Sequence, residues 1–465
     1  MRNRDQLFHA RAWIAAGLLL SSVISRAAFA FQAPNAEWHY NQSLALSRRG
    51  DRAGQERELK QALLLNPNLL AARDALGLCY LEDGRLGEAE RQLQTALRLK
   101  PNSAETENDL GLALAREGRT AAAIEMFQRA VSHDPRYTGA LMNWGVALAG
   151  EGKYFQAAPL FEQVIQISPR FVSAYIALGI ATGKEGHKQG AISVLRKAVS
   201  IAPADASARV NLGIALADAG EYREALVEFK QAVRLNPQDP AAYYNEARVL
   251  STLNQADAAR KDLETACRLA PNYSQALYLL ALMERRSRDM AGSTGLLRKV
   301  VALSPRDSSA QYELGRNLQQ LGRPQEAIEH WRLALAADPN NTHALYSLAQ
   351  SLASDEPREA KADMTRFQAL QQQRIVLDRV RTLGNFGLAA AKHHNWTQAV
   401  SDLDQAVKLC GGCAQEEKLH RDLGLIDLQK GDVAGAEQEL GAALKLDPND
   451  GDALKAMQVA RSRSR

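Results

Sequence analysis

The sequence is poor in aromatic residues and in strand-like patterns, and it lacks the short motifs that identify many enzymes. Aromatic side chains make up 6% of the 465 residues, although 46% of the residues are hydrophobic. Alternating β-branched runs are nearly absent, whereas alanine, leucine, glutamine, arginine and glutamate, which favour helices, are abundant. No phosphate-binding loop, nucleophile elbow or HExxH helix occurs. We therefore expect an all-α protein that is not an enzyme and holds no cofactor or metal.

The first thirty residues have the pattern of a secretory signal peptide. Basic residues precede an apolar stretch at 12–24, and Ala28 and Ala30 are the small residues that a signal peptidase reads. Thirteen apolar residues are fewer than the roughly 20 needed to span a bilayer. The pattern thus favours cleavage before Phe31 over an uncleaved membrane anchor. We expect an exported protein, periplasmic or extracellular, with no stable membrane span after cleavage.

The expected mature chain has little net charge. Loss of the leader removes four arginines and one aspartate, which lowers the formal net charge from +4 to +1. Sequence-independent binding to nucleic acids or anionic membranes depends on a strong positive charge. Nucleic acid is therefore not expected to be a partner.

Nine prolines recur at a fixed spacing of 34 residues, a period typical of stacked two-helix units rather than of one globular core. They stand at positions 67, 101, 135, 169, 203, 237, 271, 305 and 339. We number each repeat so that this proline is position 32 and is expected to end the second helix. Repeats 1 to 9 then begin at Ala36, Leu70, Ala104, Thr138, Val172, Ala206, Pro240, Ser274 and Ser308.

Other positions align in the same register. Position 8 is small in every repeat, position 20 is mostly alanine, and position 24 is always bulky, as in Phe127, Phe161 and Phe229. Small residues at 8 and 20 predict a close crossing of the two helices, with the residue at 24 filling the space beside them. Position 15 is glycine in seven of the nine repeats, where a left-handed turn ends the first helix; Asn254 and Arg288 replace it in the others.

This pattern of helix, tight turn, helix and proline resembles the tetratricopeptide repeat family over most of the chain. The resemblance implies an all-α, right-handed superhelical α-solenoid of about twelve stacked helix-turn-helix units. Three degenerate repeats follow Pro339, and they begin at Thr342, Val380 and Glu417. The expected boundaries are a signal peptide at 1–30, a short linker at 31–35, nine regular repeats at 36–341, a degenerate repeat with a lengthened helix at 342–379, two further repeats at 380–450, and a capping helix with a basic tail at 451–465.

A stacked-repeat protein lines a groove with its first helices, at positions 2, 5, 6, 9 and 12. Position 5 is apolar in Met142, Ile176 and Val210, and it becomes tyrosine in Tyr244, Tyr278, Tyr312 and Tyr346. Position 9 changes from Val146, Ile180 and Ile214 to Arg248, Leu282 and Arg316, and Arg285 stands at position 12. We expect an apolar zone that grips apolar side chains and a tyrosine–arginine zone that takes acidic or planar partners. The alternative is that the tyrosines only pack between neighbouring first helices.

Asparagine recurs at position 6, in Asn41, Asn143, Asn211, Asn245 and Asn385. By resemblance to related solenoids, such asparagines hold the main chain of an extended peptide, because an amide both donates and accepts hydrogen bonds. Other residues interrupt the column, so local hydrogen bonding and surface solvation are alternatives.

Cys410 and Cys413 lie where one helix has ended and the next begins. In a chain exported to an oxidising compartment, the favoured interpretation is that the two cysteines form a disulfide that holds this turn. A thiol-disulfide redox role for the pair is an alternative, although the strand and helix that usually frame such a pair are missing. A zinc site with nearby histidines is a further alternative. Haem attachment is excluded, because Ala414 stands where a histidine is required.

The function expected from the sequence is that of an exported scaffold that binds partner proteins or extended peptides in its groove. A component of envelope or polysaccharide assembly and secretion, with glycan against the tyrosines, is the first alternative. The second is a redox protein that uses the Cys410–Cys413 pair.

Overall fold

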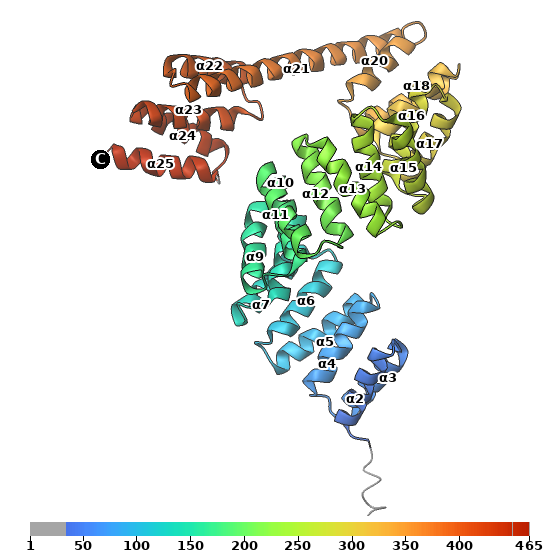
Figure 1. Cartoon of the computed structure of the whole chain (residues 1–465). Coiled ribbons are helices and arrows are strands. Elements are labelled where there is room, and N and C mark those ends of the chain that lie inside the picture. Colours follow the sequence, from blue (N-terminus) through green and yellow to red (C-terminus); the bar gives the residue numbers. More distant parts are fainter. Residues whose placement is uncertain (1–33, 449, 465) are drawn as a thin grey trace, which may run out of the picture. The chain divides into compact units, whose positions relative to one another are not determined.

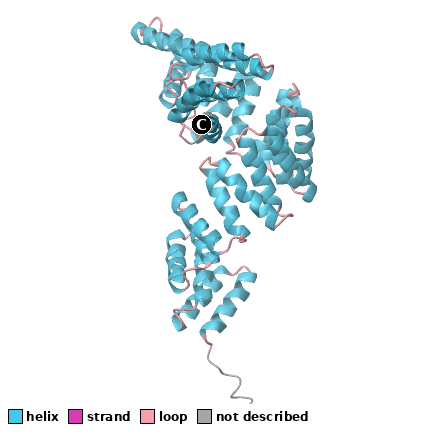
Figure 2. Cartoon of the chain, turned by 90° about the vertical axis from the view of Figure 1, so that its left-hand side faces the viewer, coloured by secondary structure: helices cyan, strands magenta, loops and turns pink. Residues whose placement is uncertain are grey.

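The computed structural model describes residues 34–448 and 450–464, and every regular element in that part of the chain is an α-helix (Figures 1 and 2). The expected all-α solenoid of helix-turn-helix repeats is confirmed. The signal peptide predicted at 1–30 lies outside the described residues. The chain divides into two compact parts, which we call the N-terminal segment, up to residue 269, and the C-terminal segment, from residue 270.

From residue 34 onward, the N-terminal segment is made of seven helix pairs, and the first helix of each pair begins at position 1 of its repeat. In each pair the two helices pack together, and the second helices of the first six pairs pack on the first helix of the next pair. The helices are α2 (Ala36–Arg48), α3 (Arg52–Leu65), α4 (Leu70–Glu82), α5 (Leu86–Leu99), α6 (Ala104–Arg116), α7 (Thr120–His133), α8 (Thr138–Gly150), α9 (Tyr154–Ile167), α10 (Val172–Lys184), α11 (Lys188–Ile201), α12 (Ala206–Ala219), α13 (Tyr222–Leu235), α14 (Pro240–Thr252) and α15 (Ala256–Leu269).

The C-terminal segment continues the same pairing with a less regular end. Two regular pairs come first, and a short helix and one very long helix follow them. The helices are α16 (Ser274–Arg286), α17 (Met290–Leu303), α18 (Ser308–Gln320), α19 (Pro324–Ala337), α20 (Thr342–Ser351), α21 (Pro357–Lys392), α22 (Trp396–Cys410), α23 (Glu416–Lys430), α24 (Val433–Leu446) and α25 (Gly451–Arg463).

Local sequence explains where these helices start and stop. Several first helices begin after a side chain that accepts a hydrogen bond from the exposed backbone N–H groups, for example Asp205 before α12 and Asn341 before α20. Second helices of repeats 1 to 9 end two residues before the proline at position 32. The residue in front of that proline is forced out of the helical region, as at Asn66, with φ −137° and ψ 94°.

The turn inside each of repeats 1 to 9 takes the left-handed conformation that position 15 predicts. Gly50, Gly84 and their equivalents have positive φ, and no atom lies within 4 Å of a Cβ added there. Asn254 and Arg288 keep the same turn, with φ of 58° and 67°. The turn is therefore set by the repeat as a whole, and the two non-glycine residues adopt a conformation that costs roughly 1 kcal/mol or more for an L-residue.

The helices of a repeat meet at positions 8 and 24, as the column pattern predicts. A Cβ at Gly145 would lie 2.5 Å from Cε1 of Phe161, and one at Gly111 would lie 2.5 Å from Cε1 of Phe127. Both phenylalanines are 1% exposed. The residue at position 24 thus occupies the space that a side chain at position 8 would need.

Helix α21 joins two repeats that the sequence separates. It runs for 36 residues, so the boundary expected between residues 379 and 380 lies inside a continuous helix. No glycine or proline occurs between Pro357 and Gly384, and this stretch is rich in good helix formers. Without a breaker, the second helix of repeat 10 continues into the first helix of repeat 11.

Candidate functional site

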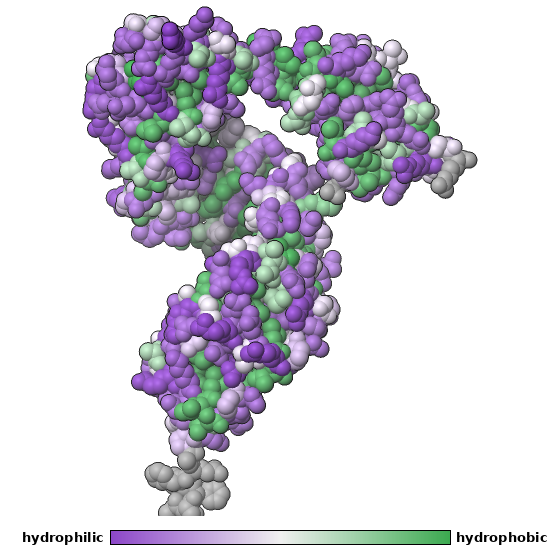
Figure 3. Space-filling model, turned by 180° about the vertical axis from the view of Figure 1, so that it is seen from behind, coloured by the Kyte–Doolittle hydropathy of each residue, from purple (hydrophilic) through white to green (hydrophobic). Residues whose placement is uncertain are grey.

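The first helices α4, α6, α8, α10, α12 and α14 contact one another in order along the N-terminal segment. We call the surface that their positions 2, 5, 6, 9 and 12 form the groove face. Figure 3 shows one side of the molecule, where hydrophobic patches interrupt the hydrophilic surface over the helices nearest the N-terminus. Such patches become relevant to binding where they line a hollow.

The apolar part of the groove face is exposed mainly at position 9. Val146 is 55% exposed and Ile180 is 41% exposed. At position 5, Met142 and Ile176 are half-buried and Val210 is only 9% exposed. Position 9 rather than position 5 therefore exposes most of the apolar surface on these helices.

A pocket of about 250 Å³ lies in this zone between α10 and α12. Gly179 and Gly183 leave room for it, and Ile180 and Ile214 form apolar walls. Asn211, which the sequence assigns to peptide contact, also lines it. The pocket is large enough to hold a large aliphatic side chain. Its lining is mostly apolar, and it also includes the amide of Asn211 and the charged residues Lys184 and Asp218.

The asparagines of position 6 make local hydrogen bonds. Nδ2 of Asn143 donates to Oδ1 of Asn108 in the preceding repeat at 2.8 Å. Nδ2 of Asn211 donates to the carbonyl of Ser207 at 2.9 Å, one turn back on the same helix. An amide nitrogen has a second proton, and in both residues the amide oxygen is a further acceptor. These two side chains keep part of their capacity to hold a peptide backbone.

Carboxylates gather on the groove face beside the apolar zone. Asp74 on α4 accepts a hydrogen bond from Oγ1 of Thr106 at 3.0 Å, and Asp109 on α6 accepts one from Nδ2 of Asn108 at 3.2 Å. Burial, with the negative charges of Asp74 and Glu105 nearby, raises the pKa of Asp109 to about 6. Burial also raises the pKa of Asp74. This acidic group was not predicted, although its three residues stand at groove positions: Asp74 at position 5 of repeat 2, and Glu105 and Asp109 at positions 2 and 6 of repeat 3.

In α14 the predicted site residues contact one another. The guanidinium carbon of Arg248 lies 5.8 Å from the ring centroid of Tyr244, within reach of a cation–π interaction. Nη1 of Arg248 donates to Oδ1 of Asn245 at 3.1 Å, and Nδ2 of Asn245 donates to the carbonyl of Ala241 at 2.9 Å. Asn245 is buried, so it is not available to a peptide backbone in the way that the sequence suggested.

In the C-terminal segment, the tyrosines and one arginine of the expected zone have partners within the chain. Tyr312 stacks on His343 with ring centroids 5.4 Å apart, and Tyr346 lies 5.2 Å from the ring of Phe367. Tyr278 is half-buried, and burial raises its pKa.

The two arginines that this zone has in the C-terminal segment, Arg285 and Arg316, differ in exposure and in their ion pairing with Glu313. Arg285 forms an ion pair with Glu313 of the next repeat, and both side chains are largely buried. Arg316 lies 4.0 Å from the same carboxylate and is mostly exposed. An acidic partner would therefore have to compete with Glu313 for Arg285.

Cys410 and Cys413 form a disulfide at the end of α22. Gly411 and Gly412 between them both have positive φ, which permits the sharp turn. Cys410 is only 8% exposed. Within the described residues, no group of three or more histidine, cysteine, aspartate or glutamate side chains is arranged to hold a metal ion.

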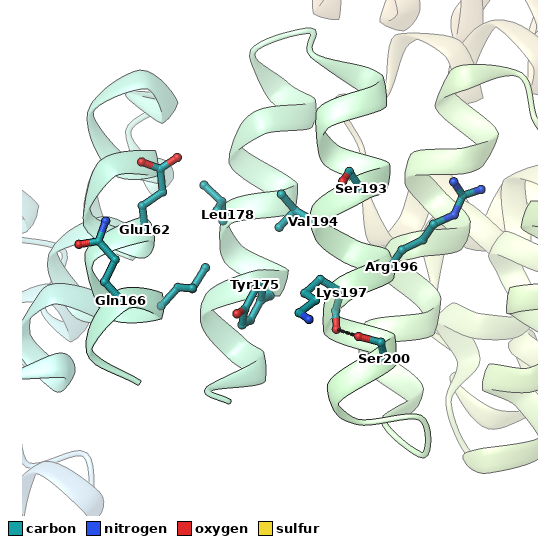
Figure 4. Close-up of a pocket in the computed structure, with 10 residues that line it drawn as sticks. Glu162, Gln166, Tyr175, Leu178, Ser193, Val194, Arg196, Lys197 and Ser200 are labelled. Carbon is teal, nitrogen blue, oxygen red and sulfur yellow. Dashed lines mark hydrogen bonds between the residues drawn. The ribbon is translucent and has the colours of Figure 1, made fainter. Parts of the chain in front are cut away.

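A larger pocket, of about 610 Å³, lies on α9, α10 and α11, away from the groove residues (Figure 4). Tyr175 lines it from α10 and Lys197 from α11, whereas Arg196 extends toward the next repeat, where it pairs with Glu224 at 2.8 Å. In repeat 6, Arg209 and Glu228 form an ion pair at the positions that Tyr175 and Val194 occupy here.

No helix in the described part of the chain has the length and apolar character needed to cross a membrane. The comparison with curated proteins gave no significant match.

Solved structures of repeat proteins resemble parts of the chain. A tetratricopeptide repeat protein from Parabacteroides merdae is 18% identical over 53% of this chain and 98% of its own, with a TM-score of 0.46. MamA is 28% identical over 34% of this chain and 93% of its own, with a TM-score of 0.33. YrrB, described as a TPR protein with an unusual peptide-binding site, is 21% identical over 40% of this chain and 96% of its own, with a TM-score of 0.33.

Family models give the clearest result, since every model that matches is one of the tetratricopeptide repeat. The matches cover well over half of the chain in total. They span residues 71–103, 108–170, 176–240, 216–283, 308–341 and 385–453. The chain therefore belongs to the tetratricopeptide repeat family, whose members generally act as scaffolds for protein interactions.

Proposed function

We propose that this protein is an exported, non-catalytic scaffold that binds an extended segment of a partner protein along the groove face of its N-terminal segment. The observation that carries the proposal is the pocket between α10 and α12, which opens on partly exposed Ile180 and is lined by Asn211. An exposed apolar hollow with a polar group at its side is the usual form of a site for a side chain of a bound peptide.

The pocket accounts for both affinity and orientation. Burial of one aliphatic side chain of the partner is worth about 1.5–3 kcal/mol. Asn143 and Asn211 stand at position 6 of repeats 4 and 6, and each amide keeps a second N–H proton and its oxygen beyond the hydrogen bond that it makes within the chain. These remaining groups would bind the partner's backbone at two separated points. The surrounding half-buried residues Met142 and Ile176 would exclude water from the contact.

Selection of ligands from a random peptide library tests the proposal. Selected peptides should bind the wild-type chain and lose at least tenfold in affinity for the Ile180→Asn variant. Val227→Asn is the matched control, because Val227 is 57% exposed on the second helix α13, outside the groove face. Equal affinity for the two variants would contradict groove binding, and circular dichroism would verify that both variants keep their helices.

Export is supported by the disulfide between Cys410 and Cys413, because such bonds persist in oxidising compartments. The signal-peptide pattern at the N-terminus agrees with this location. Fractionation of the producing cells and N-terminal sequencing should find a chain that begins at Phe31 outside the cytoplasm. A cytoplasmic chain that retains its leader would contradict export.

A further inference from the structure

The groove face of the N-terminal segment changes its character along its length. Its α8, α10 and α12 part is apolar, whereas its α4 and α6 part carries Asp74, Glu105 and Asp109 at positions 5, 2 and 6. Asp74 on α4 accepts a hydrogen bond at 3.0 Å from Thr106 on α6, the residue after Glu105, and Asp109 lies one helical turn further along α6. The charges of Asp74 and Glu105 both raise the pKa of Asp109. The acidic end and the apolar pocket thus belong to one continuous row of first helices.

The three carboxylates differ from other acidic residues nearby because no cation neutralises them. Glu107 of the same helix is fully buried and pairs with Arg129 at 2.8 Å and with His133 at 2.7 Å. Glu90 pairs with Arg119 at 2.9 Å. Within the described residues, Asp74, Glu105 and Asp109 form no ion pair, and the charge of Lys100 acts on Asp74 only from a distance.

An unneutralised charge in a half-buried position favours a cation from outside. Burial, together with the charges of Asp74 and Glu105, raises the pKa of Asp109. Burial raises the pKa of Tyr137 as well, and the charges of Asp109 and Glu105 add to that shift. A positive group placed between the carboxylates would lower the repulsion among them and would replace lost hydration with charge-assisted hydrogen bonds. A negatively charged partner residue at this end would be repelled by the carboxylates.

We propose that the segment bound in the groove carries lysine or arginine at the acidic end and a bulky aliphatic residue in the pocket between α10 and α12. This inference rests on the proposed function and names the chemistry of the partner. Complementary charge selects the basic residue, and the apolar walls of Ile180 and Ile214 select the aliphatic one.

The helix spacing sets the distance between these two residues. Packed helices lie about 8–10 Å apart, and two to three such steps separate α6 from the pocket, so the two ends of the site are roughly 25 Å apart. An extended chain advances about 3.3 Å per residue. The basic and the aliphatic residue should therefore be separated by roughly seven residues.

Synthetic peptides of twelve residues test this spacing and charge. Both peptides of one pair carry two lysines at one end and a leucine about seven residues away. In one peptide the lysines are N-terminal to the leucine, and in the other they are C-terminal to it. A second pair replaces the lysines by glutamates, with all other residues unchanged. Fluorescence anisotropy on the full chain should show that a lysine peptide binds at least tenfold more tightly than its glutamate counterpart, with an advantage that falls as salt rises.

Two sets of variants assign the effect. Asp74→Asn with Asp109→Asn keeps both hydrogen-bond acceptors and should remove most of the lysine preference. Glu125→Gln with Glu264→Gln removes two exposed charges on the second helices α7 and α15 and should leave the preference unchanged. If lysine and glutamate peptides bind alike in both directions, the inference is wrong.

The Ile180→Asn variant separates this inference from the proposed function. Weaker binding of all peptides to that variant, without any charge preference in the wild type, would overturn the inference and leave groove binding intact. If the lysine peptides instead bind the Ile180→Asn variant as tightly as the wild type, the apolar pocket is not part of the site.

Discussion

The contact between positions 8 and 24 makes a strong prediction for the Gly145→Ala variant. The added Cβ would lie 2.5 Å from Cε1 of Phe161, and it would also lie 2.8 Å from Cζ of the same ring. Carbon atoms in contact are normally about 3.5–4.0 Å apart, so α8 and α9 must separate by roughly 1 Å or the ring must leave its rotamer. Overpacking of this kind costs about 1–3 kcal/mol.

The helix itself would gain from the same substitution. Alanine is better than glycine in a helix interior by about 0.8–1 kcal/mol. Because two ring carbons of Phe161 lie closer than 3 Å to the added Cβ, we expect a cost in the upper half of that range, about 2–3 kcal/mol. After the helix gain of about 0.8–1 kcal/mol, the net loss in stability of repeat 4 should be about 1–2 kcal/mol. Gly150→Ala is the matched control, because a Cβ there meets no atom within 4 Å and the substitution should not destabilise the helix.

The chain itself indicates a compensating change. Position 24 is aromatic only where position 8 is glycine, and repeats 7 and 8 combine Ala247 with Leu263 and Ala281 with Leu297. Gly145→Ala with Phe161→Leu should therefore recover about 1 kcal/mol relative to the sum of the two single changes. Hydrogen exchange of the α8 and α9 amides in the full chain measures this locally. Additive losses, or no loss for Gly145→Ala alone, would refute the close-packing explanation.

Two further predictions concern stability. Burial and the charge of Asp262, opposed by Lys230, raise the pKa of Glu246 to about 7. Between about pH 4.5 and 7 the native state therefore keeps a proton that the unfolded chain releases, so stability falls as pH rises through this window. In hydrogen exchange of α14, Glu246→Gln should add about 2–3 kcal/mol at pH 8 and nothing at pH 4, and an equal gain at both pH values would contradict this linkage. Arg288→Gly should stabilise the α16–α17 turn by about 0.5–1 kcal/mol in thermal unfolding, because it relieves a positive φ, and a similar gain from Arg288→Ala would contradict that cause.

The sequence predicts the repeat core well because each contact in it recurs every 34 residues. The pairing of Gly145 with Phe161 is visible as two columns of the sequence, without any structure. The long helix α21 was only partly foreseen, since a missing turn leaves no positive signal and is seen only as the absence of a breaker.

The groove was harder to predict because its side chains depend on the neighbouring repeat. From its position 12 alone, Arg285 is predicted to offer its guanidinium group to a partner. In the structure, Glu313 at position 6 of the next repeat forms an ion pair with it. Val210 reads as a groove residue by its column, yet it is buried. Position in a repeat gives the direction of a side chain, whereas its availability is decided by which residue the next repeat places opposite to it.

Site-specific photo-crosslinking in the producing cells tests the central claim most directly. A photoreactive amino acid at position 180 lies in the pocket between α10 and α12, and one at position 227 lies on an outer helix with comparable exposure. Groove binding predicts that position 180 captures a distinct partner protein that position 227 does not capture. Identical products at both positions, or capture of only a second copy of this chain, would contradict the account.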